Sequence, residues 1–274
     1  MRSSPFLTIL PAFLAALSGC TGLPTVPALP EVPLTLPGRY TIVREQFIIH
    51  SDFPLAPRHR LVEELAARRH DLSCRLELPA SGELTHVYLF GDADRFHRFM
   101  RLYHPDFPQR RAFFVETDTR LIVYAYWGDR VAEDLRHEVS HGYLHSVVPY
   151  LPLWLDEGLA EFFEVPRGRN GINRTHLDRL RVLLQQDNWH PDLRRLERLD
   201  SPFGMTQDDY AEAWAWVHFL LHSGPEYGDL LRGYLRALRR DGSAEPLSVG
   251  LGPRLEQSQQ ALAEYVRLLN EGCK

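Results

Sequence analysis

The sequence predicts an α+β fold, with a small mixed β-sheet and its helices in the N-terminal part and a mainly α-helical C-terminal part. Segments with alternating or β-branched residues are confined to the chain before residue 128. After Trp127 and Gly128 the apolar residues follow a helical spacing. The chain has 274 residues, of which 44% are hydrophobic and 24% charged. This composition is sufficient for one sizeable core.

Four strands and two helices are expected in the N-terminal part, residues 39–128. The strands alternate or are rich in β-branched residues, and the last two flank Thr117-Asp118-Thr119 as a hairpin. Leucines at helical spacing mark the first helix, and Phe96 and Phe99 lie on one side of the second. The strands are expected at residues 40–49, 84–90, 111–116 and 120–126, and the helices at 57–76 and after Asp92.

Six helices are expected in the C-terminal part, residues 129–274. Pro152 favours the first turn of one helix, and Gly272 follows the last one as a C-terminal cap. No internal repeat is visible in the sequence. The helices are expected at about 130–147, 153–164, 174–188, 206–223, 226–240 and 255–270.

The first twenty residues resemble a bacterial lipoprotein signal. Arg2 precedes an apolar run over residues 6–17, and the sequence Leu17-Ser18-Gly19-Cys20 matches a lipobox, in which the cysteine receives the lipid. The run is shorter than the roughly 20 apolar residues that a membrane span needs. An ordinary signal peptide or a short membrane anchor is the alternative.

Cleavage of residues 1–19 would leave Cys20 as a lipidated N-terminus followed by a tether over residues 20–38. Prolines at every third position between residues 24 and 33 favour a polyproline II helix there. The resemblance implies a protein of the bacterial cell envelope, held at the membrane by its lipid. Thr21, in place of the aspartate that retains many lipoproteins in the inner membrane, favours the periplasmic face of the outer membrane.

Charge and cysteine content exclude other classes of protein. The formal net charge is −5 and no basic block is present, so nucleic acid is not an expected partner. Cys20, Cys74 and Cys273 are too few for a disulfide framework or a cysteine-based zinc site. In an oxidising envelope compartment Cys74 and Cys273 are expected to form one disulfide, and two unpaired thiols are the alternative.

Residues 135–145 contain the motif H-E-x-x-H. His137 and His141 are four residues apart, so on a helix both can bind one zinc ion, and Glu138 can face the attacking water. Two surface histidines on an amphipathic helix are the alternative. His145 lies about 12 Å from His137 along the helix axis and cannot share that ion. We therefore assign His145 to the helix surface or to packing.

A second motif, W-L-D-E-G-L-A-E at residues 154–161, offers a third ligand. Catalytic zinc takes three protein ligands and leaves one position open, and Glu157 is expected to be the third. Glu161, one turn later, is expected to accept the second ring N–H of a ligating histidine. The alternative is a charged stripe on a surface helix. It fits less well, because large apolar residues surround the two carboxylates, where unpaired charges are costly.

Together the two motifs resemble those of the gluzincin metallopeptidases, which include thermolysin and aminopeptidase N. The bacterial peptidase-MA-like proteins of this group are the most similar, and the resemblance covers roughly residues 110–240. It implies a zincin-like fold and one Zn²⁺ per chain, with His137, His141 and Glu157 as its ligands. It also implies Glu138 as the general base.

Residues 209–221 resemble the helix that begins with an oxyanion-stabilising tyrosine in aminopeptidase N-type enzymes. This resemblance implies Tyr210 as the oxyanion donor, with His218 and His222 in reserve for the role and a core tyrosine as the alternative. The strand at 121–126 lacks the G-A-M-E-N motif of those enzymes, so aminopeptidase activity is not expected.

The sequence therefore predicts zinc-dependent hydrolysis of a peptide bond in a peptide or protein substrate. Glu138 would act as the base, Tyr210 would stabilise the oxyanion, and the substrate would lie antiparallel to the strand at 121–126. A non-catalytic zinc-binding lipoprotein, acting as a scaffold or chaperone, is one alternative, although it would gain nothing from Glu138. A zinc amidase that cleaves cell-wall peptides is another.

Overall fold

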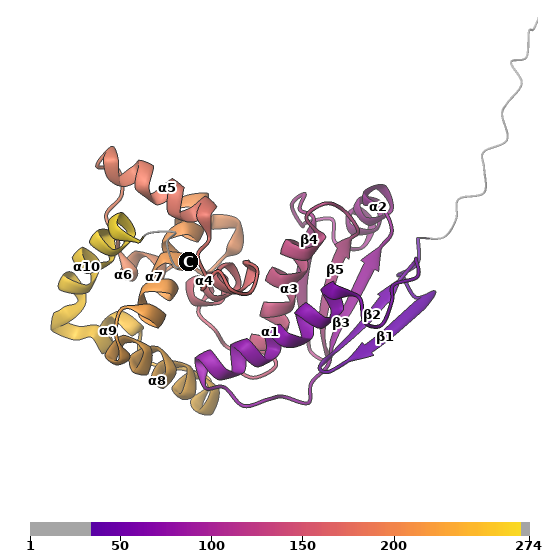
Figure 1. Ribbon diagram of the computed structural model, residues 1–274, viewed down its shortest axis with the longest axis horizontal. Coiled ribbons are helices and arrows are strands. Elements are labelled where there is room, and N and C mark those ends of the chain that lie inside the picture. The colour runs from indigo at the N-terminus through magenta and orange to yellow at the C-terminus, as the bar shows by residue number, and fades with distance from the viewer. Residues whose placement is uncertain (1–33, 270–274) are drawn as a thin grey trace, which may run out of the picture. The chain divides into compact units, whose positions relative to one another are not determined.

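A computed structural model describes residues 34–269, which contain a five-stranded mixed sheet (Figure 1). The strand order is β1-β2-β3-β5-β4, so β4 forms one edge of the sheet. The β1/β2 and β4/β5 pairs are antiparallel, and β2/β3 and β3/β5 are parallel. The strands are β1 (Tyr40–Arg44), β2 (Phe47–Ser51), β3 (Thr85–Phe90), β4 (Ala112–Thr117) and β5 (Arg120–Tyr126).

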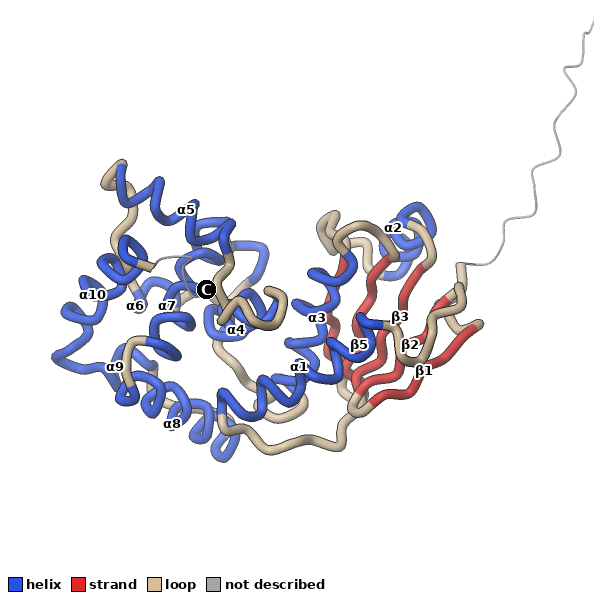
Figure 2. Tube along the Cα trace, in the orientation of Figure 1, coloured by secondary structure: helices blue, strands red, loops and turns tan. Residues whose placement is uncertain are grey.

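The α+β class predicted from the sequence is confirmed, because strands dominate the first part of the chain and helices the rest (Figure 2). Two one-turn helices, α6 and α9, were not predicted, since four or five residues are too few to reveal a helical period. The helices are α1 (Arg60–Leu76), α2 (Ala93–Tyr103), α3 (Val131–His145), α4 (Leu153–Glu164), α5 (Arg174–Gln185), α6 (Leu193–Leu196), α7 (Gln207–His222), α8 (Pro225–Asp241), α9 (Leu247–Leu251) and α10 (Leu255–Leu268).

Several N-terminal and C-terminal features predicted from the sequence lie outside the described residues. These are the signal peptide, Cys20, most of the tether, and Cys273. Cys74 is exposed on α1, and its disulfide with Cys273 stays a prediction. None of the helices between residues 34 and 269 has the length and apolar character needed to cross a bilayer.

The single strand predicted at residues 40–49 is wrong. The chain reverses at Glu45 and Gln46, and β1 and β2 pair with Arg44 opposite Phe47. Glu45 adopts a positive φ of 50° in this turn. The turn was missed because it contains no Gly, Asn or Asp, the usual marks of a two-residue hairpin. The three consecutive polar residues at 44–46 are the only local sign of it.

The second hairpin, β4 and β5, was predicted correctly. Its position in the sheet, however, excludes the expected pairing of a substrate with the strand at 121–126. Thr117 and Arg120 close the hairpin, and the Arg120 N–H donates to Thr117 Oγ1 at 3.1 Å. The strand at 121–126, β5, pairs with both β3 and β4. It has no free edge, so the proposed pairing of a substrate with this strand is wrong, and β4 is the edge strand of the hairpin.

Helices cover both faces of the sheet (Figure 1). On one face, α1 and α3 enclose the larger core, which includes Val87 and Val123 of the central strands. On the other face, α2 packs Phe96 and Phe99 around Phe90 in a separate aromatic cluster. Because helices cover both faces, apolar residues dominate the central strands β3 and β5, although Thr85 and His86 of β3 are polar.

Two glycines allow helices α3 and α4 to approach their neighbours closely. A Cβ at Gly142 of α3 would lie 2.7 Å from Thr85 Oγ1 on β3, and a Cβ at Gly158 of α4 would lie 2.6 Å from the carbonyl oxygen of Ala213 on α7. A backbone carbonyl cannot turn aside as a flexible side chain can. Gly158 is therefore required for the contact between α4 and α7.

Replacing Gly158 with alanine is expected to lower the free energy of unfolding by about 1–3 kcal/mol through overpacking, although alanine favours an isolated helix by roughly 1 kcal/mol. Gly233 of α8 is the matched control, since the nearest atom to its Cβ would be Arg236 Nη2 at 4.0 Å. Gly233→Ala should stabilise the protein by about 0.5–1 kcal/mol. Urea unfolding followed by circular dichroism measures both changes, and equal effects would contradict the close contact.

Candidate metal centre

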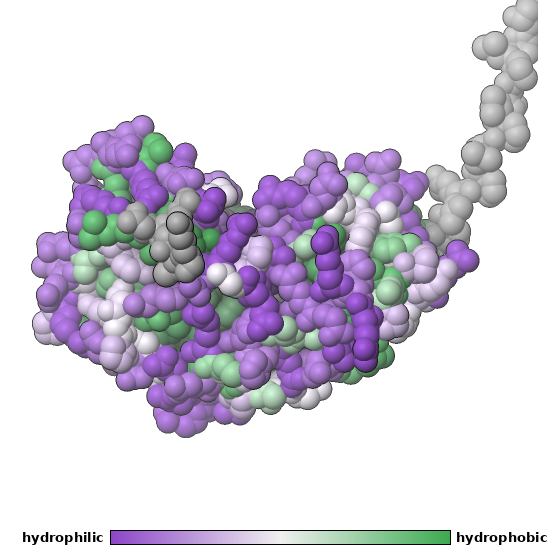
Figure 3. Space-filling view, in the orientation of Figure 1, coloured by the Kyte–Doolittle hydropathy of each residue, from purple (hydrophilic) through white to green (hydrophobic). Residues whose placement is uncertain are grey.

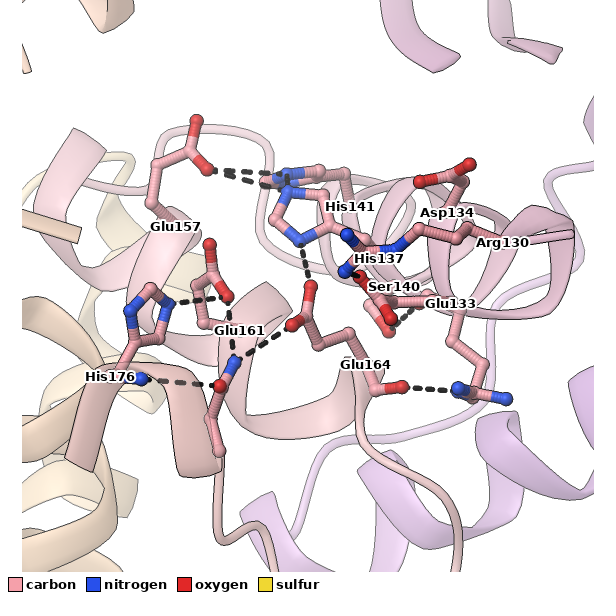
Figure 4. Close-up of polar contacts among 12 residues, drawn as sticks. Arg130, Glu133, Asp134, His137, Ser140, His141, Glu157, Glu161, Glu164 and His176 are labelled. Atoms are coloured by element: carbon pink, nitrogen blue, oxygen red, sulfur yellow. Dashed lines mark hydrogen bonds and ion pairs between the residues drawn. The ribbon is translucent and has the colours of Figure 1, made fainter. Parts of the chain in front are cut away.

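The antiparallel helices α3 and α4 bring the three predicted ligands together (Figure 4). His137 Nε2 lies 3.2 Å from His141 Nε2 and 3.5 Å from Glu157 Oε2. The distance from His141 Nε2 to Glu157 Oε2 is 3.8 Å. The three side chains thus form a group that could hold a metal ion.

The local sequence explains this arrangement. His137 and His141 are separated by four residues on α3, so their rings project from one face. The chain then reverses within residues 146–152, and Pro152 is the N-cap residue of α4. This short connection makes the two helices antiparallel and allows Glu157, in the second turn of α4, to face both rings.

Each of the two candidate histidine ligands has a carboxylate at its other ring nitrogen. His141 Nδ1 lies 2.9 Å from Asp156 Oδ1, and His137 Nδ1 lies 3.1 Å from Glu164 Oε2. In Figure 4, Glu157 and Glu164 lie on opposite sides of the His137 ring. Such contacts fix the ring orientation and the tautomer of a ligating histidine.

Glu164, not Glu161, contacts a candidate histidine ligand. The sequence predicted this contact for Glu161, but His137 Nδ1 lies beside Glu164. Because α3 and α4 are antiparallel, His137 lies opposite the C-terminal end of α4, and Glu164 is almost two full helical turns beyond Glu157 on the same face. Glu161 Oε2 lies 2.7 Å from Nε2 of His176 on α5. Asn173 Nδ2 donates to Glu161 at 3.1 Å and to Glu164 at 2.8 Å, and so links the two carboxylates.

His145 belongs to the same polar network, although the sequence assigned it to surface or packing. Its Nε2 lies 3.0 Å from Asp156 Oδ2 and its Nδ1 lies 2.6 Å from Oε2 of Glu116 on β4. Burial by itself would lower the pKa of His145, but Asp156 and Glu116 raise it to about 9. The network therefore runs from His141 through Asp156 and His145 to the edge strand.

Two arginines hold the C-terminal end of α4, which has no glycine cap. Arg68 Nη2 donates to the carbonyl oxygen of Val165 at 2.8 Å, and Arg136 Nε donates to the carbonyl oxygen of Glu164. These bonds satisfy carbonyl groups left open at a helix end. They also fix the turn from which the Glu164 side chain reaches His137.

A pocket of about 730 Å³ opens beside these helices. In the space-filling view a hollow with hydrophilic rims lies between the α5 side and the α2 and β4 side (Figure 3). His137, Glu138 and Tyr210 line the pocket, as does Arg110, which the sequence analysis missed. Arg110 Nη2 donates to Tyr210 Oη at 3.1 Å. No sequence motif contains Arg110, which meets Tyr210 only in the folded chain.

Burial and neighbouring charges shift the pKa values of the site residues. Burial raises the pKa of Glu138, although His137 and His141 act in the opposite direction, and the backbone N–H of Phe114 on β4 donates to its carboxylate. Burial by itself would lower the pKa of His137, but Glu157 and other nearby carboxylates raise it well above its usual value. Buried negative charge thus surrounds the histidines.

His218 and His222 do not line the pocket and are not in position to replace Tyr210. Their rings stack 4.3 Å apart, and His218 Nδ1 lies 2.7 Å from Tyr265 Oη on α10. Burial, with help from His222 and Arg75, lowers the pKa of His218 to about 3. His218 is therefore a neutral core residue at physiological pH.

Residues 133–240 match the model of a family described as a protein of unknown function (DUF1570). This match covers less than half of the chain and extends from α3 to α8, which includes the three candidate ligands and Tyr210 but not β4. No curated protein matches the chain.

His218 predicts a pH dependence of stability. The unfolded state takes up a proton near pH 6.5 and the folded state only near pH 3, so stability falls as the pH drops between these values, by about 1.4 kcal/mol per pH unit. His218→Gln should make this slope shallower by up to that amount. Urea unfolding of both metal-free proteins between pH 7 and pH 4.5 measures the slopes, and identical slopes would contradict the assignment.

Proposed function

We propose that the chain is a zinc-dependent hydrolase that cleaves peptide bonds, with His137, His141 and Glu157 as zinc ligands. The observation that supports this most strongly is the triangle of their donor atoms, with sides of 3.2, 3.5 and 3.8 Å. Ligands at 2.0–2.2 Å from a tetrahedral zinc ion lie roughly 3.3–3.6 Å apart. The match is close enough for one ion to bind with small side-chain movements.

Charge and hydrogen bonding support the same assignment. Oε2 of Glu157 is buried and has no hydrogen-bond partner among residues 34–269, which is the situation of a ligand atom without its cation. The ion-pair partners of Glu157 that the structure describes are the two histidines, His137 and His141. Three protein ligands beside an open pocket also favour a catalytic zinc site over a structural one, which takes four ligands.

Bound zinc would supply a Lewis acid and lower the pKa of a coordinated water to about 7. Glu138 lies next to His137 in the pocket wall, where it can take a proton from the attacking water and return it to the leaving nitrogen. Tyr210 accepts a hydrogen bond from Arg110, so its own O–H remains free to donate to the carbonyl oxygen of the substrate.

An extended substrate would pair with β4, in place of the interior strand β5. Phe114 of β4 stacks on His141, and its N–H donates to Glu138, so this edge runs directly beside the reacting groups. Addition of a strand gives affinity through main-chain hydrogen bonds. This pairing would present a backbone amide, the group to be hydrolysed, to the metal.

The same proposal includes anchoring at the bacterial cell envelope through a lipid on Cys20. Metabolic labelling with a fatty acid should mark the wild-type protein but not Cys20→Ser.

A non-catalytic zinc-binding lipoprotein, acting as a scaffold or chaperone, is the competing function, and a peptide amidase of the cell wall differs only in substrate. The scaffold alternative predicts that zinc binds and that Glu138 has no effect on any measured activity.

Glu138→Gln tests the mechanism. The purified protein should contain about one zinc per chain, and the variant should keep this zinc while kcat for peptide hydrolysis falls by about 10²–10⁴-fold, because the base is lost. Elemental analysis and a quenched-peptide library give the two readouts. A protein that takes up no zinc would contradict the proposal, as would full activity of Glu138→Gln.

Tyr210→Phe tests the oxyanion donor. It should lower kcat by about 10²–10³-fold with unchanged zinc content, because one hydrogen-bond donor to the oxyanion is lost.

Glu164→Gln distinguishes the contact seen in the structure from the one predicted by the sequence. Loss of the carboxylate at His137 Nδ1 should weaken zinc affinity by about 10–100-fold. Glu161→Gln, which alters a contact with His176, is the matched control and should have a smaller effect. Competition with a chelator measures the affinities. The reverse order would restore Glu161 to the role predicted from sequence.

A further inference from the structure

Six arginines line the pocket beside Glu138, and three of them form ion pairs with nearby carboxylates. Arg111, for example, makes bonds to both carboxylate oxygens of its partner at 2.7–3.0 Å. These pairs stabilise the pocket wall and leave little charge for a ligand. They are Arg111 with Asp134, Arg130 with Glu133, and Arg136 with Glu64.

Arg110 differs from these residues. Among residues 34–269 no carboxylate lies within ion-pair distance of its guanidinium, whose hydrogen-bond partner is the phenol oxygen of Tyr210. The residue is exposed, so a ligand can reach it from the pocket. Partial desolvation of the guanidinium at the pocket wall would by itself lower the pKa of Arg110, but the bond to Tyr210 and the charges of Glu157 and Glu138 raise this pKa above its usual value. Arg110 therefore holds an accessible positive charge close to the reacting groups.

The lack of a carboxylate partner favours an anionic group beside Arg110. In the proposed zinc-bound site Glu157 and Glu138 would face the ion, while Glu161 contacts His176 and Glu164 contacts His137, so none of these carboxylates pairs with Arg110. A guanidinium presents five N–H donors in a planar fork that matches a carboxylate through two parallel hydrogen bonds. Tyr210 accepts from one of these nitrogens and holds the group in place, which leaves other donors free.

We propose that Arg110 binds a carboxylate of the substrate, so that the pocket selects acidic peptides. This inference rests on the proposed hydrolase function. Arg110 lies two residues before β4, the edge strand beside Glu138, so the recognised carboxylate belongs to a residue near the scissile bond. An acidic side chain and a C-terminal α-carboxylate have the same chemistry, and both would fit a bidentate contact.

Matched peptides test the proposal by binding, independently of hydrolysis. Fluorescent peptides that differ only by Glu or Gln at one position, or by a free or amidated C-terminus, are titrated into the full-length Glu138→Gln protein with added zinc. We expect the acidic form of one pair to bind about 10–100-fold more tightly. The pair that shows this difference identifies the source of the carboxylate.

Arg110→Gln in the same background should reduce that preference to less than about threefold, and Arg110→Lys should restore only part of it, because lysine lacks the fork. Arg111→Gln is the matched control, since it removes a neighbouring arginine that is already paired with Asp134. It should leave the preference unchanged. Equal loss in both variants would indicate general electrostatic attraction and would overturn the proposal.

The same peptides given to the wild-type enzyme separate the two proposals. An Arg110-dependent preference in binding without any cleavage would uphold the inference and contradict the hydrolase function. Cleavage of acidic and amide peptides at equal kcat/KM, unaffected by Arg110→Gln, would uphold the hydrolase and overturn the inference. Failure of every peptide to bind would overturn the recognition of acidic peptides.

Discussion

The antiparallel contact between α3 and α4 is the constraint on which the site depends. It places histidines of α3 against carboxylates of α4, so that Asp156 and Glu164 each lie within hydrogen-bond distance of an imidazole nitrogen. Asp156 lies between His141 and His145, and Glu164 continues the series beyond His137. Buried carboxylates without such partners would be strongly destabilising. The contact that packs α3 against α4 is therefore also the contact that gives their buried carboxylates hydrogen-bond partners.

Contacts outside the two helices keep this register fixed. Gly158 brings α4 against the backbone of α7, so α4 cannot slide without a clash. Arg68 and Arg136 bind the carbonyl groups at its C-terminal end. The shift that a single turn of slippage would cause is about 5.4 Å, enough to separate Glu157 from the two histidines. The precision of the site thus comes from packing and capping of the whole helix.

The sequence was sufficient for features that depend on local period and spacing. Helix α4 was predicted at residues 153–164, as it is found, and His137 and His141 share a face because they are four residues apart. Partner choice between elements could not be predicted in this way. Glu164 was missed because its contact with His137 depends on the direction and axial offset of α4. The reversal at Glu45 was missed because no turn residue marks it.

Two segments of the chain contribute different parts of the pocket, and this has a consequence for specificity. The candidate ligands and Tyr210 lie within residues 133–240, the range that matches the family model, whereas Arg110 and β4 precede it. In the proposed enzyme the helical segment would supply the metal ligands and Tyr210. The loop before β4 would supply Arg110 and so decide which charge a substrate must have to approach Glu138. Changes in that loop would alter selection without disturbing the buried histidine and carboxylate network, since Arg110 contacts the helical segment through a single phenol oxygen.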